Sequence, residues 1–275
     1  MTATRRLVIV GGGHMGLAII RGLLGGPAGP EIVVVERSAA RRELLAELDG
    51  LTVVAHLDLA DGDFVVLAVP PQVFAEFADA ERHRFTPGTP VLSVMAGLTA
   101  ETIATTLGTT QVVRSIPNTP SEVFQGMSVY HAGPQVSAET TAQAEALLGV
   151  IGRVLRVDRE ELVDDATAIC GGGPAFVSYI VDAFCQFAAA RGFSEAAGRE
   201  MAVQVFGGTA TLIAESGKPP MQLCHEVMTP NGTTERGIAA FDAAGLKGSI
   251  LTALTAAAQR SRELARPHGP GCAVG

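Results

Sequence analysis

The chain has 275 residues and a formal net charge of −8, and 47% of its residues are hydrophobic while only 17% are charged. A nucleic-acid-binding protein presents a basic face to the phosphates, so this charge argues against that class. The length suits one large domain or two modest ones. The abundance of apolar residues suits burial against a partner subunit as well as inside the chain.

We expect neither a secretion signal nor a membrane span. The most hydrophobic stretch, 174–190, contains Asp182 near its centre, and a carboxylate in the middle of a span is costly. A buried helix of a soluble protein is therefore expected there. The cysteines lack CxxC or metal-ligand spacing, which favours reduced thiols in a cytoplasmic protein without a metal site. They are Cys170, Cys185, Cys224 and Cys272.

The first half of the chain alternates between short apolar runs and helical patterns. The apolar runs are rich in valine and isoleucine, which is typical of strands buried in a parallel sheet. Alternation of strand and helix predicts an α/β domain with a doubly wound sheet covered on both faces. The expected strands are 7–10, 32–35, 64–69, 91–94, 112–116 and 153–157, and the expected helices are 15–24, 39–48, 72–80, 100–107 and 137–148.

The strand pattern ends near residue 158, so we expect a first domain over 1–158 and an all-helical domain over 159–266. Pro174 is expected to begin a helix, because proline at the first helical position loses no hydrogen bond. A helix that is apolar nearly all round must be surrounded, which predicts a dimer interface. We expect the tail 267–275 to be disordered. The expected helices are 160–169, 174–191, 195–216, 233–243 and 247–264.

A glycine-rich loop follows the first expected strand. Gly11, Gly13 and Gly16 fit the G-x-G-x-x-G pattern, which allows a tight turn, close approach of the backbone to a pyrophosphate, and close packing of helix on strand. Glu36 ends the second strand, 20 residues beyond Gly16, where a carboxylate accepts the ribose hydroxyls. This context predicts a dinucleotide cofactor. His14 lies inside the loop and faces either phosphate or solvent.

The choice between NADPH and NADH stays open at this stage. Glu36 favours NADH because its charge repels a 2′-phosphate, whereas Arg37 and Ser38 are able to bind one. Arg41 and Arg42 are able to help, although two arginines in this position are also typical of a solvated helix face.

Two later segments suggest where a small substrate binds. The segment 170–174 is expected to form a second glycine-rich loop that opens a helix, and 229–234 is expected to form a turn that enters another. A helix N-terminus leaves backbone N–H groups unpaired and attracts an anion, and Thr229 and Thr234 add hydroxyl donors. The alternative is that Thr229 or Asn231 merely caps the helix.

The chain resembles the pyrroline-5-carboxylate reductase family in six ordered motifs between residue 5 and about residue 265. Known members have a nucleotide-binding Rossmann domain and an all-helical domain that interlocks with a second subunit, which agrees with the dimer expected above. The motifs are Gly11-x-Gly13-x-Met15-Gly16, Leu67-Ala68-Val69-x-Pro71-Gln72, Ser93-x-x-Ala96-Gly97-Leu98, Pro117-Asn118-Thr119-Pro120, Gly171-x-Gly173-Pro174-Ala175 and Asn231-Gly232-Thr233-Thr234.

The resemblance implies reduction of 1-pyrroline-5-carboxylate to L-proline, by hydride transfer from NADPH or NADH to the ring imine carbon, in a dimer or an oligomer of dimers. It also implies that the ring lies beside the nicotinamide while its carboxylate is held by the 229–234 turn. The implied catalytic residues are Thr234 and Thr229, and the implied substrate-binding residues are Asn231, Gly232, Thr233, Gly173 and Pro174. The implied cofactor-binding residues are Gly11, Gly13, His14, Met15, Gly16, Glu36, Arg37, Ser38, Ala68, Val69, Pro70, Ala96, Gly97, Pro117 and Asn118.

Hydride transfer to a protonated imine chiefly requires positioning, so we expect no catalytic triad, and the proton comes from the substrate's iminium form or from water. Pro117 and Asn118 follow a strand end, where ligands collect in such sheets, although Asn118 is equally typical of a turn. A β-hydroxyacid dehydrogenase is disfavoured because its catalytic lysine would lie early in the second domain, whereas the only lysines here are Lys218 and Lys247.

The chain departs from the family at several positions. The family usually has serine at the positions of Cys170 and Gly172 and lysine at that of Pro70, asparagine is common at that of Glu36, and Met228 replaces a small polar residue. These departures keep a second function open, the reduction of a six-membered or substituted cyclic imino acid. A non-catalytic nucleotide-binding protein is a third possibility.

Overall fold

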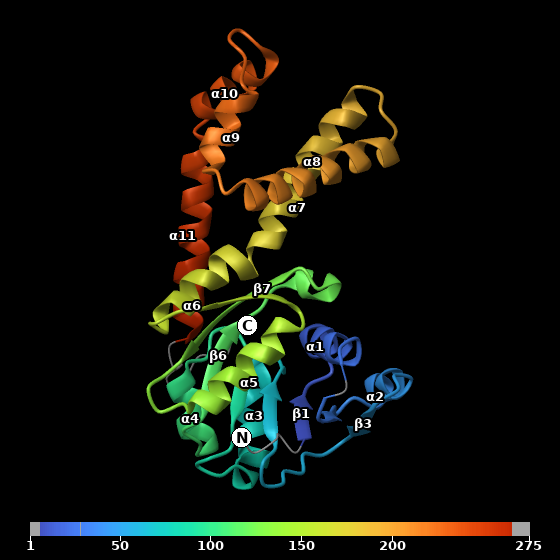
Figure 1. Ribbon diagram of the computed structural model, residues 1–275, viewed down its shortest axis with the longest axis vertical. Helices are drawn as coiled ribbons and strands as arrows, with labels where there is room; N and C mark the ends of the chain where they lie inside the picture. Colours follow the sequence, from blue (N-terminus) through green and yellow to red (C-terminus); the bar gives the residue numbers. More distant parts are fainter. Residues whose placement is uncertain (1–5, 28, 266–275) are drawn as a thin grey trace, which may run out of the picture. The chain divides into compact units, whose positions relative to one another are not determined.

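The computed structural model describes residues 6–27 and 29–265. The chain divides into two compact units (Figure 1). One contains the residues up to Gly172 together with those from Ala257, and the other is Gly173–Ala256. The expected disordered tail 267–275 lies outside the described residues.

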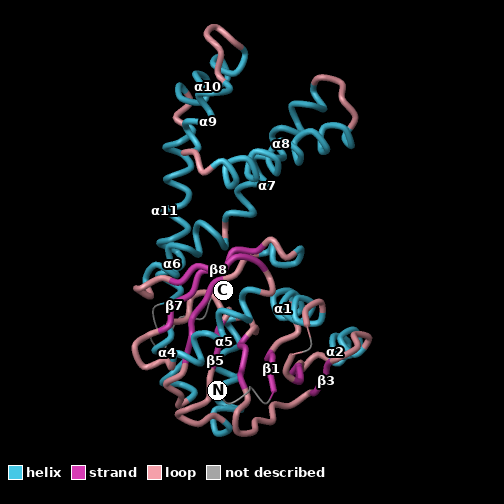
Figure 2. The backbone as a smooth tube through the Cα atoms, viewed as in Figure 1, coloured by secondary structure: helices cyan, strands magenta, loops and turns pink. Residues whose placement is uncertain are grey.

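The first unit is built on an eight-stranded sheet with the order β3-β2-β1-β4-β5-β6-β7-β8. The strands β1 to β6 are parallel, whereas β7 is antiparallel to β6 and β8 is parallel to β7. Figure 2 shows the strands of this sheet in magenta. The strands are β1 Arg6–Val10, β2 Glu31–Val35, β3 Leu51–Val54, β4 Phe64–Leu67, β5 Val91–Ser93, β6 Val112–Ile116, β7 Gly126–Ala132 and β8 Gly152–Arg156. All six expected strands are present.

The sequence pattern misses β3 and β7. The strand β3 lies at the sheet edge and is only half-buried, so its sequence shows no long apolar run. The strand β7 contains Ser128, which is fully buried, and His131. These polar residues interrupt the apolar run by which a buried strand is recognised.

Helices cover both faces of this sheet, as the alternating pattern predicts. The residues Leu7 and Ile9 of β1 pack with α1 and α5 in one apolar cluster, whereas Val8 and Val10 pack with α3 and α4 in another, because successive strand residues face opposite sides. The helices of this unit are α1 His14–Leu24, α2 Ala39–Ala46, α3 Phe74–Glu81, α4 Ala100–Leu107, α5 Ala138–Gly149 and α6 Glu161–Ala166, with short 3₁₀ turns at Pro71–Val73, Arg82–Arg84 and Thr119–Val123.

The second unit is entirely helical. It contains α7 Gly173–Ala190, α8 Glu195–Ser216, α9 Pro220–Val227, α10 Thr233–Ala243 and the first part of α11 Leu246–Ala265. The helices α7 and α8 pack together through an edge-on contact of Phe184 with Phe206, whose ring centroids are 5.2 Å apart. Helix α9 was not expected, because its prolines are typical of a loop. Pro220 is instead the first residue of that helix, a position that proline suits.

The helical unit leaves large apolar side chains exposed. Tyr179 is 81% exposed and Leu251 is 64% exposed, and in α7 only Ala188 is buried. By length and composition alone, the helix that runs from Glu161 to Ala190 would also suit a membrane span. The exposed apolar surface therefore requires a cover from outside the chain, for which the sequence predicts a partner subunit.

The expected glycine-rich loop at 170–174 is wrong. Thr167–Gly171 instead forms a π-helical turn directly after α6, and α7 begins at Gly173, one residue before Pro174. The Gly172 N–H donates to the carbonyl of Thr167, five residues earlier. The chain therefore forms a wider helical turn at these glycines and not a loop. Such wide turns are frequent at functional sites.

A buried charge cluster attaches α6 and the end of α11 to the sheet. Arg114 on β6 is 1% exposed, and its guanidinium lies 2.6 Å from Asp164 and 3.1 Å from Glu160. The Ser261 hydroxyl donates to the same Asp164 carboxylate at 3.1 Å. The compact sheet unit extends to Gly172, and the domain boundary at residue 158 stays a prediction.

We predict that Asp164→Ala lowers the free energy of unfolding by about 3–5 kcal/mol, because it leaves the Arg114 charge buried without its partner. Urea denaturation followed by circular dichroism measures the effect. The control is Glu76→Ala, which breaks the exposed Arg37–Glu76 pair and should cost less than about 1 kcal/mol. Equal midpoints for the two variants would contradict the prediction.

Candidate active site: the cofactor cleft and the turn before α10

The turn between β1 and α1 passes very close to β4. Gly11 has a φ of +101°, and a Cβ atom there would lie 2.7 Å from the Ala68 carbonyl oxygen. A Cβ atom on Gly16 would collide with the carbonyl oxygen of Gly11. These two glycines are therefore required by the protein's own packing, since any side chain would push the helix away from the strand.

Gly13 is different, because the packing of the protein does not require glycine there. It is the N-cap of the 11-residue helix α1 and has no side-chain cap. A Cβ atom on Gly13 would meet only the end of the Arg41 side chain, at 3.5 Å. The space next to this helix N-terminus is what a pyrophosphate needs for close approach to the backbone. The loop thus fits a dinucleotide cofactor.

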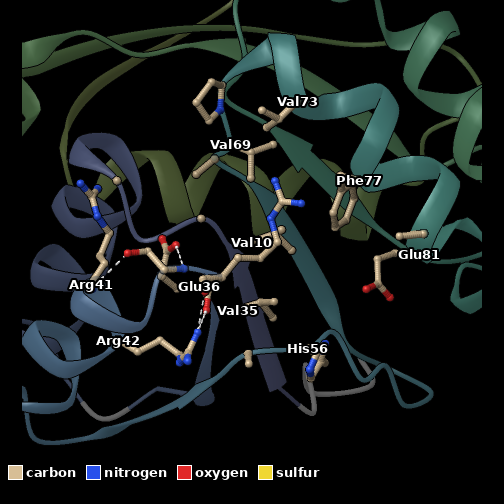
Figure 3. A pocket seen from close by; sticks show the side chains of 18 residues that line it. Val10, Val35, Glu36, Arg41, Arg42, His56, Val69, Val73, Phe77 and Glu81 are labelled. Atoms are coloured by element: carbon tan, nitrogen blue, oxygen red, sulfur yellow. Dashed lines mark hydrogen bonds between the residues drawn. The ribbon is translucent and has the colours of Figure 1, made fainter.

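A cavity of about 770 Å³ opens beside this loop, within the size range of small-molecule sites. It lies outside the carboxyl ends of β1 and β4, between which the strand order reverses, and ligands bind at such points. In Figure 3, Glu36 and Arg42 lie on one side of it and Phe77 and Glu81 of α3 on the other. Eight predicted cofactor residues line it: Gly11, Gly13, Glu36, Arg37, Ser38, Ala68, Val69 and Pro70.

Sequence reasoning missed part of the lining. His56 follows β3, a strand that the sequence pattern did not reveal. Val73, Phe77 and Glu81 also line the cavity, and their spacing of four residues places them on one face of a helix. This four-residue spacing is visible in the sequence and indicates that the three side chains share one helix face.

The carboxylate of Glu36 is held in place by two backbone N–H groups. Gly12 donates to one oxygen at 3.0 Å, and Ser38 donates to the other at 2.9 Å. The arginines of α2 also contact this region. Arg42 donates to the backbone carbonyls of Glu36 and Arg37, at 3.0 and 2.7 Å.

The remaining predicted cofactor residues lie away from the lining of this cavity. His14 is exposed, and its Nδ1 lies 3.4 Å from Glu122. Asn118 is anchored at both ends of its amide: it donates to the Cys170 carbonyl at 3.2 Å and accepts from the Met127 N–H at 2.8 Å. This geometry supports the interpretation of Asn118 as a turn residue.

The other predicted cofactor residues outside the lining also lie near strand ends or in α1. Met15 and Gly16 lie in α1, Ala96 and Gly97 follow β5, and Pro117 follows β6.

The turn before α10 is tightly formed. The Gly232 N–H donates to the Thr229 carbonyl at 2.8 Å, and Asn231 has a φ of +58°. A Cβ atom on Gly232 would collide with the Thr229 hydroxyl. Gly232 is the N-cap of α10, and no side chain of the described residues caps that helix. The alternative that Thr229 or Asn231 caps it is therefore wrong.

This turn leaves the α10 N-terminus able to receive an anion. The Glu235 carboxylate in the first turn accepts the N–H of Asn231 at 2.6 Å, a group outside the helix. Thr229 is exposed, whereas Thr234 is half-buried. Gly173 and Pro174 start α7, at the opposite end of the helical unit from this turn (Figure 1), so one chain does not bring the two predicted substrate segments together.

No group of three or more His, Cys, Asp or Glu side chains is placed to hold a metal ion within residues 6–27 and 29–265. Cys170, Cys185 and Cys224 are free thiols. The Cys170 side chain packs against an apolar cluster that contains Ile116 and Val163, and burial raises the pKa of its thiol.

We predict that Gly13→Ala weakens NADH or NADPH binding at least about tenfold, because the new methyl group occupies the space beside the α1 N-terminus. Its thermal midpoint should stay near that of the parent, since N-cap changes of this kind cost about 1 kcal/mol or less. Calorimetric titration and thermal unfolding measure the two effects. The contrasting variant is Gly16→Ala, which should lower the midpoint as well. Unchanged cofactor affinity in Gly13→Ala would refute the assignment.

A second prediction concerns the pH dependence of Cys170 alkylation. Burial favours the neutral thiol, so the iodoacetamide rate should reach half its maximum above the pH of about 8.5 that is usual for a free cysteine. The measurement uses a variant in which Cys185, Cys224 and Cys272 are serine. Unfolding that variant in urea should return the midpoint to the usual value. A folded midpoint at or below that value would contradict the burial argument.

Comparison with known proteins places the chain in a family. Residues 160–264 match the family described as pyrroline-5-carboxylate reductase dimerisation, and residues 6–97 match the family described as NADP oxidoreductase coenzyme F420-dependent. The chain is 34% identical to a pyrroline-5-carboxylate reductase of Pseudomonas aeruginosa, over 97% of this chain and 99% of that protein. It is 32% identical to one from Synechocystis, over 95% and 98% of the two chains.

A solved pyrroline-5-carboxylate reductase from Coxiella burnetii is 28% identical, with a TM-score of 0.88 over 97% of this chain and 100% of that one. The fold therefore agrees with the sequence match over nearly the whole length, in the sheet unit and in the helical unit alike. The described dimerisation region also accounts for the exposed apolar helices. The chain belongs to the pyrroline-5-carboxylate reductase family.

Proposed function

We propose that this protein reduces 1-pyrroline-5-carboxylate to L-proline with NADPH or NADH. The observation that carries the proposal is the match over 97% of the chain to a reductase of that name, at 34% identity. The glycine loop supports it independently. Gly13, where the protein's packing does not require glycine, stands where a pyrophosphate approaches the α1 N-terminus.

The sheet unit holds the cofactor in this proposal. Gly13 and the α1 N-terminus receive the pyrophosphate, and the fixed carboxylate of Glu36 receives the ribose hydroxyls. Ala68, Val69 and Pro70 form the wall beside β4. The reduced nicotinamide, when bound, supplies the hydride. The enzyme's own contribution is to place the cofactor and exclude other orientations, which lowers the barrier by several kcal/mol in well-oriented reactions.

The helical unit binds the substrate carboxylate. The uncapped N-terminus of α10 offers backbone N–H groups, and Thr229 and Thr234 add hydroxyl donors. Asn231, Gly232 and Thr233 complete the turn. A protonated imine is already electrophilic, so these residues orient the ring and need not transfer a proton. The proton on nitrogen comes from the iminium form of the substrate or from water.

The protein self-associates through its dimerisation region. We propose that a second copy covers the exposed apolar faces of α7 and α8, rather than lipid or nucleic acid, and that dimers are able to assemble further. The three described cysteines are free, which supports a reducing, cytoplasmic location.

The alternative substrate, a six-membered or substituted cyclic imino acid, has weaker support. It rests on the departures at Cys170, Gly172 and Met228. Cys170 packs into an apolar cluster and Gly172 lies at the end of the π-helical turn, so neither of these two departures by itself indicates a different ring.

The test is the loss of absorbance of reduced nicotinamide on addition of the imine. We expect 1-pyrroline-5-carboxylate to be reduced faster than its six-membered homologue. Faster turnover of the six-membered ring would favour the alternative substrate. Cofactor binding without oxidation in the presence of either ring would refute the reductase function.

We predict that Thr234→Val raises the KM for the imine about 10- to 100-fold, because a hydrogen bond to a charged group contributes about 1.5–3 kcal/mol. The KM for the cofactor should change less than about twofold, since the cofactor is held in the other unit. Thr234→Ser keeps the hydroxyl and should behave like the parent in steady-state kinetics. Equal increases in both KM values would show that the substrate carboxylate does not bind at this turn.

A further inference from the structure

We propose that this protein uses NADH in preference to NADPH, and that Glu36 is the residue that decides between them. The inference rests on the proposed function, because it concerns the cofactor of that same cleft. Sequence alone leaves the choice open, since an acid and several arginines stand together after β2. The hydrogen bonds of these side chains resolve it.

The first observation is the fixed orientation of the Glu36 carboxylate. Its two oxygens accept the backbone N–H groups of Gly12 and Ser38, at 3.0 and 2.9 Å. One of these donors belongs to the glycine loop and the other to the start of α2, so the carboxylate is anchored from both sides of the β2 end. A group held in this way cannot easily turn away from an incoming ligand.

The second observation is what remains available on that carboxylate. Each oxygen has two lone pairs, and each uses one for a backbone donor. The remaining lone pairs are able to accept the two ribose hydroxyls of NADH. A 2′-phosphate offers oxygen acceptors in place of a hydroxyl donor, and it brings a second negative charge to a fixed negative charge. NADPH therefore loses a hydrogen bond and gains a repulsion at the same position.

The third observation concerns the groups that would bind a 2′-phosphate. Arg37 pairs with Glu76 at 2.6 Å, which offsets its charge. The Ser38 hydroxyl oxygen accepts the Arg41 N–H as the cap of α2, which orients this side chain and leaves only its O–H to donate. Arg42 donates to the backbone carbonyls of Glu36 and Arg37 (Figure 3).

Arg41 reaches the glycine loop rather than the end of β2. Its guanidinium lies 3.4 Å from the Gly12 carbonyl oxygen and close to Gly13, the position assigned to the pyrophosphate. That position is common to NADH and NADPH, so Arg41 does not distinguish them. The guanidinium groups of Arg37, Arg41 and Arg42 thus have partners within the protein, while the acid faces the ribose position.

The test measures dissociation constants of NADH and NADPH for the intact protein by calorimetric titration, without any imine. The parent should bind NADH at least about tenfold more tightly than NADPH. Glu36→Gln keeps the shape of the side chain and removes its charge, so it should bring the ratio of the two constants to about one or reverse it. Glu43→Gln, which removes the same charge from the exposed side of α2, should leave the ratio unchanged.

Two further variants keep the result interpretable. Glu76→Gln frees Arg37 and should strengthen NADPH binding without altering NADH binding, which tests the charge argument even if Glu36→Gln fails to fold. Arg37→Ala should change the ratio less than about twofold. A strong loss of NADPH binding in Arg37→Ala would show that Arg37 binds the phosphate and would overturn the inference.

Other outcomes are equally decisive. NADPH binding as tight as NADH binding in the parent overturns the inference, as does an equal weakening of both cofactors in Glu36→Gln, which would mean that the carboxylate only supports the loop. Failure of the reductase function is distinguishable, because it would appear as selective NADH binding with no oxidation in the presence of the imine.

Discussion

The cofactor cleft depends on one close approach, that of the β1–α1 turn to the backbone after β4. Gly11 lies against the Ala68 backbone and Gly16 against the Gly11 carbonyl, so the turn and the first helix come very close to the chain after β4. This contact brings the α1 N-terminus to the carboxyl edge of the sheet. It also leaves the space beside Gly13 open. A single extra methyl group at the contact would separate helix from strand, and the site of positive potential would move with it.

A second interaction sets the extent of the sheet unit. The buried guanidinium of Arg114 pairs with Glu160, just before α6, and with Asp164 in α6, and Asp164 in turn accepts the hydroxyl of Ser261 from α11. Two segments almost a hundred residues apart in sequence are thereby attached to β6. A buried ion pair is costly to form, and this one ties α6 and the end of α11 to β6.

The helical unit does not bury all of its own apolar side chains. Its helices α7 and α8 contact each other through Phe184 and Phe206, yet Tyr179 and Leu251 stay exposed. A single chain is therefore incomplete as a hydrophobic structure, and its apolar surface belongs to an assembly. The π-helical turn at Thr167–Gly171 lies at the point where the chain enters this unit. The sheet unit and the helical unit are therefore joined by a widened helical turn and not by a loop.

The sequence by itself determined six of the strands, the glycine loop and the helical second half, because hydrophobic periodicity and glycine spacing are local properties. It could not reveal β3 and β7, whose half-burial or buried serine breaks the apolar pattern. It also placed a loop at residues 170–174, where local composition is ambiguous and helical hydrogen bonding prevails. Only the tertiary structure decided which groups around Glu36 are already bonded, because hydrogen bonds between distant residues depend on how the elements pack.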